Sequence, residues 1–147
     1  MESIIENLPM LTPYQPAIVW LLVLCISILI QSFLAGVLGF ANGKEVPGLP
    51  LKGTHADKSF RVLRTYANST ENFSVLVATM IIAILAGASP VVVNWLVGLH
   101  VVLRTVYWAV YYSGVGKAAG GPRTITYVAA FVINVILAGV AAYAMLT

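Results

Sequence analysis

The sequence predicts an all-α integral membrane protein whose 147 residues form a single domain, a bundle of four transmembrane helices. Composition is the first reason: 9% of the residues are charged and 60% are hydrophobic, whereas about 25% of an average soluble domain is charged. The second reason is the length of the apolar runs, because a helix needs about 20 residues to cross a bilayer. Four runs are long enough, at about residues 16–41, 59–88, 90–112 and 123–146.

The first and fourth runs are the most uniformly apolar. Each carries one amide side chain, Gln31 in the first and Asn134 in the fourth, and we expect both to form hydrogen bonds between helices. The single cysteine, Cys25, lies within the first run and is interpreted as a packing residue, since reactive thiols occupy polar surroundings. The N-terminal MESIIENLPM is unlike a signal peptide, so we expect the first span to be retained.

The connections between spans differ in length and charge. Spans two and three are joined by the short GASP, whereas the other two connections are longer and rich in glycine. The basic residues of the connections lie in or beside the longer loops: Lys44, Lys52, Lys58 and Lys117. The other face of the membrane holds Glu2 and Glu6. By the positive-inside rule, the longer loops are expected in the cytoplasm and both termini on the opposite side.

The second span begins with a stripe of polar residues. At about 100° per residue, Arg61, Arg64, Asn68 and Glu71 fall within an arc of roughly 80°. The stripe extends roughly 15 Å from the expected cytoplasmic end toward the apolar half. Charges are costly in hydrocarbon, so these side chains are expected to face the bundle interior or a wet cavity.

The third span carries a matching stripe. His100, Arg104, Tyr107 and Tyr111 share an arc of roughly 60° by the same count. Because the short GASP connection makes spans two and three a hairpin, both stripes lie at the cytoplasmic end and can face one cavity. Arg123 opens the fourth span at the same level, where a helix N-terminus favours an anion.

Four arginines therefore surround one carboxylate, that of Glu71. The surplus positive charge indicates an anionic ligand whose carboxylates fit guanidinium groups and whose ammonium fits Glu71. In the structural alternative, Arg64 pairs with Glu71, Arg61 and Arg123 reach to the interface, and the tyrosines form an aromatic belt.

Other site classes find little support. His100 has no second His or Cys at ligand spacing and is expected to be a hydrogen-bonded core residue, so no metal is predicted. His55 lies in a polar loop and is expected to be solvated. The net charge of +3 reflects membrane topology, so no nucleic-acid partner is predicted.

Three stretches together resemble the MAPEG superfamily, the membrane-associated proteins of eicosanoid and glutathione metabolism. RVLRTYANSTENF is similar to the second-helix signature of that family, in which an Arg is followed by an Asn four residues later and a Glu three after that. LRTVYWAVYY resembles its third-helix Arg and Tyr pattern, and GPRT resembles the Arg that opens its fourth helix. The stretches occur in the family's order and extend over nearly the whole chain.

The resemblance implies a homotrimer that binds glutathione, as co-substrate, between neighbouring subunits near the cytoplasmic face. It assigns glutathione binding to Arg64, Asn68, Glu71, Arg104, Tyr107 and Tyr111. Arg123 would be the catalytic residue, stabilising the thiolate, and Arg61 and His100 would support the site. Asn72 stands where eicosanoid-making members have a Tyr, and ANGK stands where they have adjacent arginines.

The resemblance therefore favours a membrane-bound glutathione transferase that activates the glutathione thiolate against hydrophobic electrophiles. Reduction of lipid hydroperoxides by glutathione is a second candidate activity of the same site. The expected partners are further copies of the chain, membrane lipids and the lipophilic electrophile or hydroperoxide. A non-catalytic lipid-binding or scaffold member of the same fold is the alternative, and a small transporter or channel is a third hypothesis.

Overall fold

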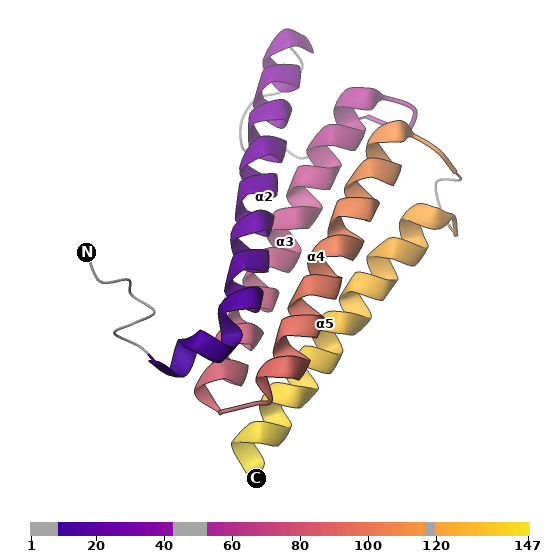
Figure 1. Ribbon diagram of the computed structural model, residues 1–147. Coiled ribbons are helices and arrows are strands. Elements are labelled where there is room, and N and C mark those ends of the chain that lie inside the picture. The colour runs from indigo at the N-terminus through magenta and orange to yellow at the C-terminus, as the bar shows by residue number, and fades with distance from the viewer. Residues whose placement is uncertain (1–8, 43–52, 117–119) are drawn as a thin grey trace, which may run out of the picture.

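The computed structural model in Figure 1 describes residues 9–42, 53–116 and 120–147. One 3-10 helix, η1 (Pro9–Tyr14), leads into four long helices: α2 (Gln15–Asn42), α3 (Lys58–Leu85), α4 (Pro90–Ser113) and α5 (Pro122–Leu146). All four helices in this part of the chain are long and apolar enough to cross a membrane. The structure thus confirms the prediction of an all-α membrane protein with four transmembrane helices.

Consecutive helices run in opposite directions, and the α3–α4 hairpin forms the centre of the bundle (Figure 1). Both α2 and α5 pack against α3 and α4, so that they flank the hairpin. The hairpin turn depends on Gly87, whose φ of 72° lies in the left-handed region that glycine adopts without strain. The Tyr14 hydroxyl donates a hydrogen bond to the carbonyl of Ala88, which ties η1 to this turn.

The helix η1 was not expected from the sequence. It ends where α2 begins, and the side chain of Asn94 in α4 forms hydrogen bonds to the backbone on both sides of this junction. Asn94 Oδ1 accepts a hydrogen bond from the backbone N–H of Ala17 at 3.1 Å, and its Nδ2 donates one to the carbonyl of Pro13 at 2.9 Å. Because the first N–H groups of a helix lack intrahelical partners, Asn94 acts as the cap of α2.

The core of the bundle has two different halves. Toward the α3–α4 turn it is apolar, with Leu76, Val93 and Val97 fully buried. The buried polar residues lie toward the other end, among apolar ones: Gln31, Thr65, Asn68, Ser69, His100, Arg104 and Asn134. The outward faces of the helices carry large exposed apolar side chains such as Leu29 and Phe33, as a lipid-facing surface requires.

The predicted sidedness of the protein remains a prediction. It rests on Glu2, Glu6, Lys44, Lys52 and Lys117, which lie outside the described residues, and on Lys58 at the start of α3. Helices α2 and α4 end, and α3 and α5 begin, at the end of the bundle opposite the α3–α4 turn (Figure 1). The buried polar residues lie toward that end.

Candidate functional site

A cavity of about 390 Å³ opens at the polar end of the bundle. It is formed by the first half of α3, the last two turns of α4, the first turns of α5 and the loop before α3. Its lining residues are His55, Arg64, Asn68, Glu71, Tyr107, Tyr111, Arg123, Thr124 and Tyr127. Five residues of the two polar stripes therefore meet at one cavity together with Arg123: Arg64, Asn68, Glu71, Tyr107 and Tyr111.

The charged wall of the cavity belongs to α3. Arg64 Nη1 lies 3.7 Å from Glu71 Oε1, and the two side chains are 45% and 56% exposed. An ion pair with this length and exposure contributes little to stability, about 0–1 kcal/mol. Both charged groups therefore remain accessible to a ligand that carries charges of both signs.

Asn68 is buried below this pair and is held in one orientation from behind. Arg104 Nη1 donates to Asn68 Oδ1 at 2.9 Å, and Arg104 Nη2 donates to Ser69 Oγ at 3.2 Å. Ser69 in turn donates to Gln31 Oε1 at 2.8 Å, so the network joins α4, α3 and α2. Since a guanidinium group only donates, Asn68 must direct its oxygen toward Arg104, and its NH₂ is the group left for the cavity.

Arg104 itself does not line the cavity. It is 4% exposed, and its guanidinium lies 4.7 Å from the ring centroid of Tyr107. The family resemblance assigned glutathione binding to Arg104, whereas the structure places this residue behind the cavity wall. Arg104 orients Asn68 and Tyr107, which do line the cavity.

Aromatic rings form the opposite wall. Tyr107 and Tyr111 stack one turn apart on α4 with centroids 5.5 Å apart, and Tyr127 of α5 lies 6.1 Å from Tyr107. Tyr127 and Thr124 were not predicted as site residues. Tyr127 lies four residues after Arg123, hence on the same face of α5, and this spacing could have indicated it.

Arg123 lies in the first turn of α5, directly after Pro122 and the N-terminal cap residue Gly121. Its guanidinium lies 4.8 Å from the ring centroid of Tyr111, and its Nη1 lies 3.1 Å from His55 Nδ1. The positive end of the α5 dipole adds to the charge of this arginine. A negative group at this place would be stabilised by both.

His55 corrects the prediction of a merely solvated residue. Although it is exposed, its Nδ1 lies 2.7 Å from the hydroxyl of Tyr111 as well as 3.1 Å from Arg123. Partial burial of the ring, and then the positive charges of Arg123, Arg64 and Arg61, lower its pKa below the ordinary value of 6.5. The ring is therefore neutral at neutral pH.

Two predicted supporting residues lie outside the cavity. Arg61 turns back toward the loop, where its Nη1 donates to the carbonyls of His55 and Ala56 at 2.9 and 2.8 Å. His100 is 1% exposed, and its Nδ1 lies 3.1 Å from the carbonyl of Ala130 in α5. Within residues 9–42, 53–116 and 120–147, no cluster of three His, Cys, Asp or Glu side chains has the geometry of a metal site.

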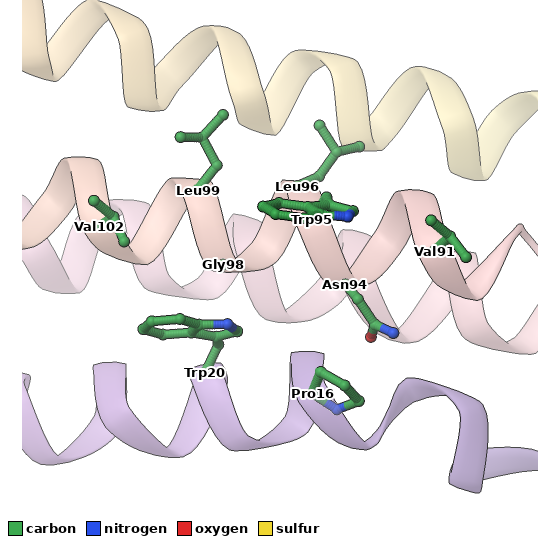
Figure 2. A pocket seen from close by; sticks show the side chains of 9 residues that line it. All are labelled: Pro16, Trp20, Val91, Asn94, Trp95, Leu96, Gly98, Leu99 and Val102. Carbon is green, nitrogen blue, oxygen red and sulfur yellow. The ribbon is translucent and has the colours of Figure 1, made fainter.

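A second, larger hollow of about 690 Å³ lies between α2 and α4 on the outer face, toward the α3–α4 turn. Figure 2 shows that Trp20 of α2 lies against Gly98 of α4, while Leu96 and Leu99 point from α4 away from α2. Its polar lining residue, Asn94, is engaged in capping α2. This groove is mostly apolar and lies at the other end of α4 from Tyr111.

The polar cavity can thus hold a ligand that combines anionic groups, a cationic group and an ionisable atom near Arg123. Anionic groups fit Arg64 and the Asn68 amide, and a cationic group fits Glu71. Arg123 and the start of α5 favour a negative charge on a third group. Stacked tyrosines supply hydroxyl groups and flat apolar faces beside it.

Comparison with known protein families identifies the family of the chain. The profile of the MAPEG family matches residues 16–143, which include nearly all of the four transmembrane helices. A search of the curated proteins found no match. Since the match extends over most of the chain, the protein belongs to the MAPEG family, whose members act at membranes in glutathione-related and eicosanoid metabolism.

Proposed function

We propose that the protein is a membrane glutathione transferase, which binds glutathione in the polar cavity and activates its thiol for attack on hydrophobic electrophiles. The observation that carries the proposal is the meeting of Arg64, Glu71 and Arg123 at one cavity. Glutathione has two carboxylates, one ammonium and one thiol. These groups match the positive, negative and helix-terminal parts of the cavity wall.

Arg64 and the Asn68 amide would hold a carboxylate, and Glu71 would hold the ammonium of the γ-glutamyl end. Placing both charges of that end in the cavity replaces the loose 3.7 Å ion pair by two charge-assisted contacts. Tyr107, Tyr111 and Tyr127 would flank the peptide. This orientation leaves the cysteinyl part of the tripeptide for Arg123.

Arg123 would stabilise the thiolate. A free cysteine thiol has a pKa of about 8.5, so only a few per cent is ionised at neutral pH. Lowering that pKa by one unit requires about 1.4 kcal/mol, which a nearby guanidinium and helix N-terminus can supply. The thiolate sulfur then displaces a leaving group from the electrophile, and the proton passes to water. The same thiolate would serve in hydroperoxide reduction.

The exposure of the charged wall supports self-association. Glu71 lies 13 residues into α3, or about 20 Å from its start, yet its side chain is 56% exposed in one chain. A carboxylate at that depth needs protein or water around it, not hydrocarbon. We therefore propose that a neighbouring copy covers this wall in a homotrimer, which also completes the glutathione site.

The role of Glu71 is tested with glutathione and N-acetylglutathione, in which the ammonium is replaced by a neutral amide. For the wild type, we expect acetylation to weaken binding by roughly tenfold or more, because hydrogen bonds to charged groups contribute about 1.5–3 kcal/mol. For Glu71→Gln the two ligands should bind with similar affinity. Thr70→Ala is the matched control, since this exposed hydroxyl bonds only within its own helix. If the ratio of the affinities for glutathione and N-acetylglutathione were the same in all three proteins, the placement of the ammonium beside Glu71 would be overturned.

The rival function is that of a scaffold protein without activity. The buried Gln31–Ser69–Arg104–Asn68 network favours this function because the network joins three helices. The two functions differ in turnover. With glutathione and a reactive aromatic halide, the transferase forms the thioether at a rate that Arg123→Ala reduces. The scaffold forms it no faster than the uncatalysed reaction.

A further inference from the structure

The loop before α3 brings one side chain, His55, into contact with residues from two other elements. Its Nδ1 lies 2.7 Å from the Tyr111 hydroxyl of α4 and 3.1 Å from Arg123 Nη1 of α5. Its ring also packs edge-on against Tyr111, with centroids 5.7 Å apart. His55 is thus the described residue through which the loop reaches Tyr111 and Arg123.

The chemistry of the partners fixes the state of the ring. Arginine can only donate, so Nδ1 must be the acceptor, and the proton of the neutral imidazole must lie on Nε2. The Tyr111 hydroxyl then donates to the same nitrogen. One imidazole lone pair therefore holds two side chains that line the cavity.

The segment that carries His55 is itself anchored. Arg61 Nη1 donates to the carbonyls of His55 and Ala56, and Phe60 packs edge-on against the imidazole with centroids 5.3 Å apart. Thr54 donates its backbone N–H to Asp57 Oδ2 at 3.1 Å, which closes the turn. The ring is consequently held at the mouth of the cavity from both ends of the segment.

The charges around the ring are mostly positive. Arg61 and Arg64 face it from α3, Arg123 faces it from α5, and Tyr111 faces it from α4. The nearby carboxylates are engaged elsewhere: Asp57 with Thr54, and Glu71 with Arg64. A proton on Nδ1 would remove the acceptor and add a fourth positive charge to this group.

We infer that His55 is a positioning residue of the site: its neutral ring holds Arg123 and Tyr111 beside the thiol, and protonation of the ring releases them. The inference rests on the proposed function, since the thiol is that of glutathione. Lowering the pH would then reduce thiol activation through protonation of His55, separately from protonation of the thiol itself. Below the pKa of His55, Arg123 loses its acceptor and is repelled from the loop.

Two substitutions distinguish the role of His55 as a hydrogen-bond acceptor from its role as a titratable group. His55→Asn places an amide oxygen near the position of Nδ1, and this oxygen accepts hydrogen bonds but does not titrate between pH 4 and 8. His55→Ala removes the acceptor. Thr54→Ala is the matched control, because it changes an exposed residue of the same turn whose hydroxyl makes only a 3.4 Å contact with Asp57.

The measurement is the ultraviolet absorbance of the glutathione thiolate on the detergent-purified full chain, recorded across pH 5 to 8. Binding of S-methylglutathione, which has no ionisable thiol, is measured alongside. We expect His55→Ala to lose most of the thiolate absorbance at neutral pH while binding of S-methylglutathione changes less. We expect His55→Asn to keep the absorbance and to lose it less steeply than the wild type as the pH falls.

Two results would overturn the inference. In the first, His55→Ala keeps the thiolate absorbance of the wild type and the same fall of this absorbance at low pH, called here the acid limb. In the second, His55→Asn loses the absorbance as completely as His55→Ala. A wild type that binds glutathione without a thiolate signal at any of these pH values contradicts the proposed function instead, and the inference falls with it. If His55→Ala does not keep its oligomeric state, the acid limb of His55→Asn decides alone: a limb as steep as that of the wild type contradicts the inference.

Discussion

Arg104 of α4 donates a hydrogen bond to Asn68 Oδ1 of α3 at 2.9 Å, between two side chains that are 4% and 6% exposed. This contact lies behind the cavity, so a charged residue inside the membrane serves to orient a neutral one that lines the cavity. Polar residues at this depth are costly unless they are paired. The pairing explains how Arg104 can be buried without a carboxylate beside it.

Replacing Arg104 should affect stability and binding together. Arg104→Leu leaves Asn68 Oδ1 without its donor, and a buried unsatisfied group costs about 1–3 kcal/mol. We expect a lower melting temperature in detergent and glutathione binding weakened about tenfold. Arg104→Lys can satisfy fewer acceptors at once and should be intermediate. Thr105→Ala, which loses a bond within its own helix, is the control. Unchanged affinity in Arg104→Leu would contradict the orienting role.

The cap supplied by Asn94 should stabilise the start of α2. Asn94→Ala removes the acceptor for the N–H of Ala17 and the donor to Pro13, and loss of a helix cap costs about 0.5–2 kcal/mol. The melting temperature should fall while glutathione affinity stays unchanged, because Asn94 lies far from the cavity along α4. Thr79→Ala is the matched control, since its hydroxyl bonds carbonyls of its own helix. A change in glutathione affinity would show that the two ends of the bundle are coupled.

The approach of α2 to α4 depends on Gly98. A Cβ at this position would lie 2.8 Å from Trp20 Nε1, whereas a Cβ at Gly139 of α5 would meet nothing within 4 Å. We expect Gly98→Ala to lower the free energy of unfolding by about 1–3 kcal/mol, as overpacking does. Gly139→Ala should be neutral or stabilise by up to about 1 kcal/mol, because alanine favours the helix. Thermal denaturation of both variants measures the difference, and equal melting temperatures would contradict the packing of Trp20 on Gly98.

The fold and much of the cavity follow from helical periodicity. The arcs through Arg64, Asn68 and Glu71 and through Tyr107 and Tyr111 assign each side chain to a face of its helix, and these faces line the cavity. Periodicity does not show whether a residue on that face lines the cavity or is buried behind the cavity wall. Arg104 shares the arc of Tyr107 yet is buried in the hydrogen-bond network.

Residues near helix ends could not be placed in this way. Arg61 lies in the first turn of α3, where a long side chain can reach back to the loop, and it bonds the carbonyls of His55 and Ala56. The position of His55 depends on the path of the loop, for which the sequence has no periodic signal. The short helix η1 was missed for the same reason, although Pro13 and Pro16 mark the place where the chain changes direction.

The most direct test of the account is the thiolate absorbance of glutathione bound to the wild type and to Arg123→Ala and Arg123→Lys at neutral pH. We expect a clear thiolate signal in the wild type, most of which is lost in Arg123→Ala and part of which is kept in Arg123→Lys, which retains the positive charge. A wild type that binds glutathione as the neutral thiol would contradict activation by Arg123. A signal that is equally strong in Arg123→Ala would contradict it as well, and would assign the activation to another group.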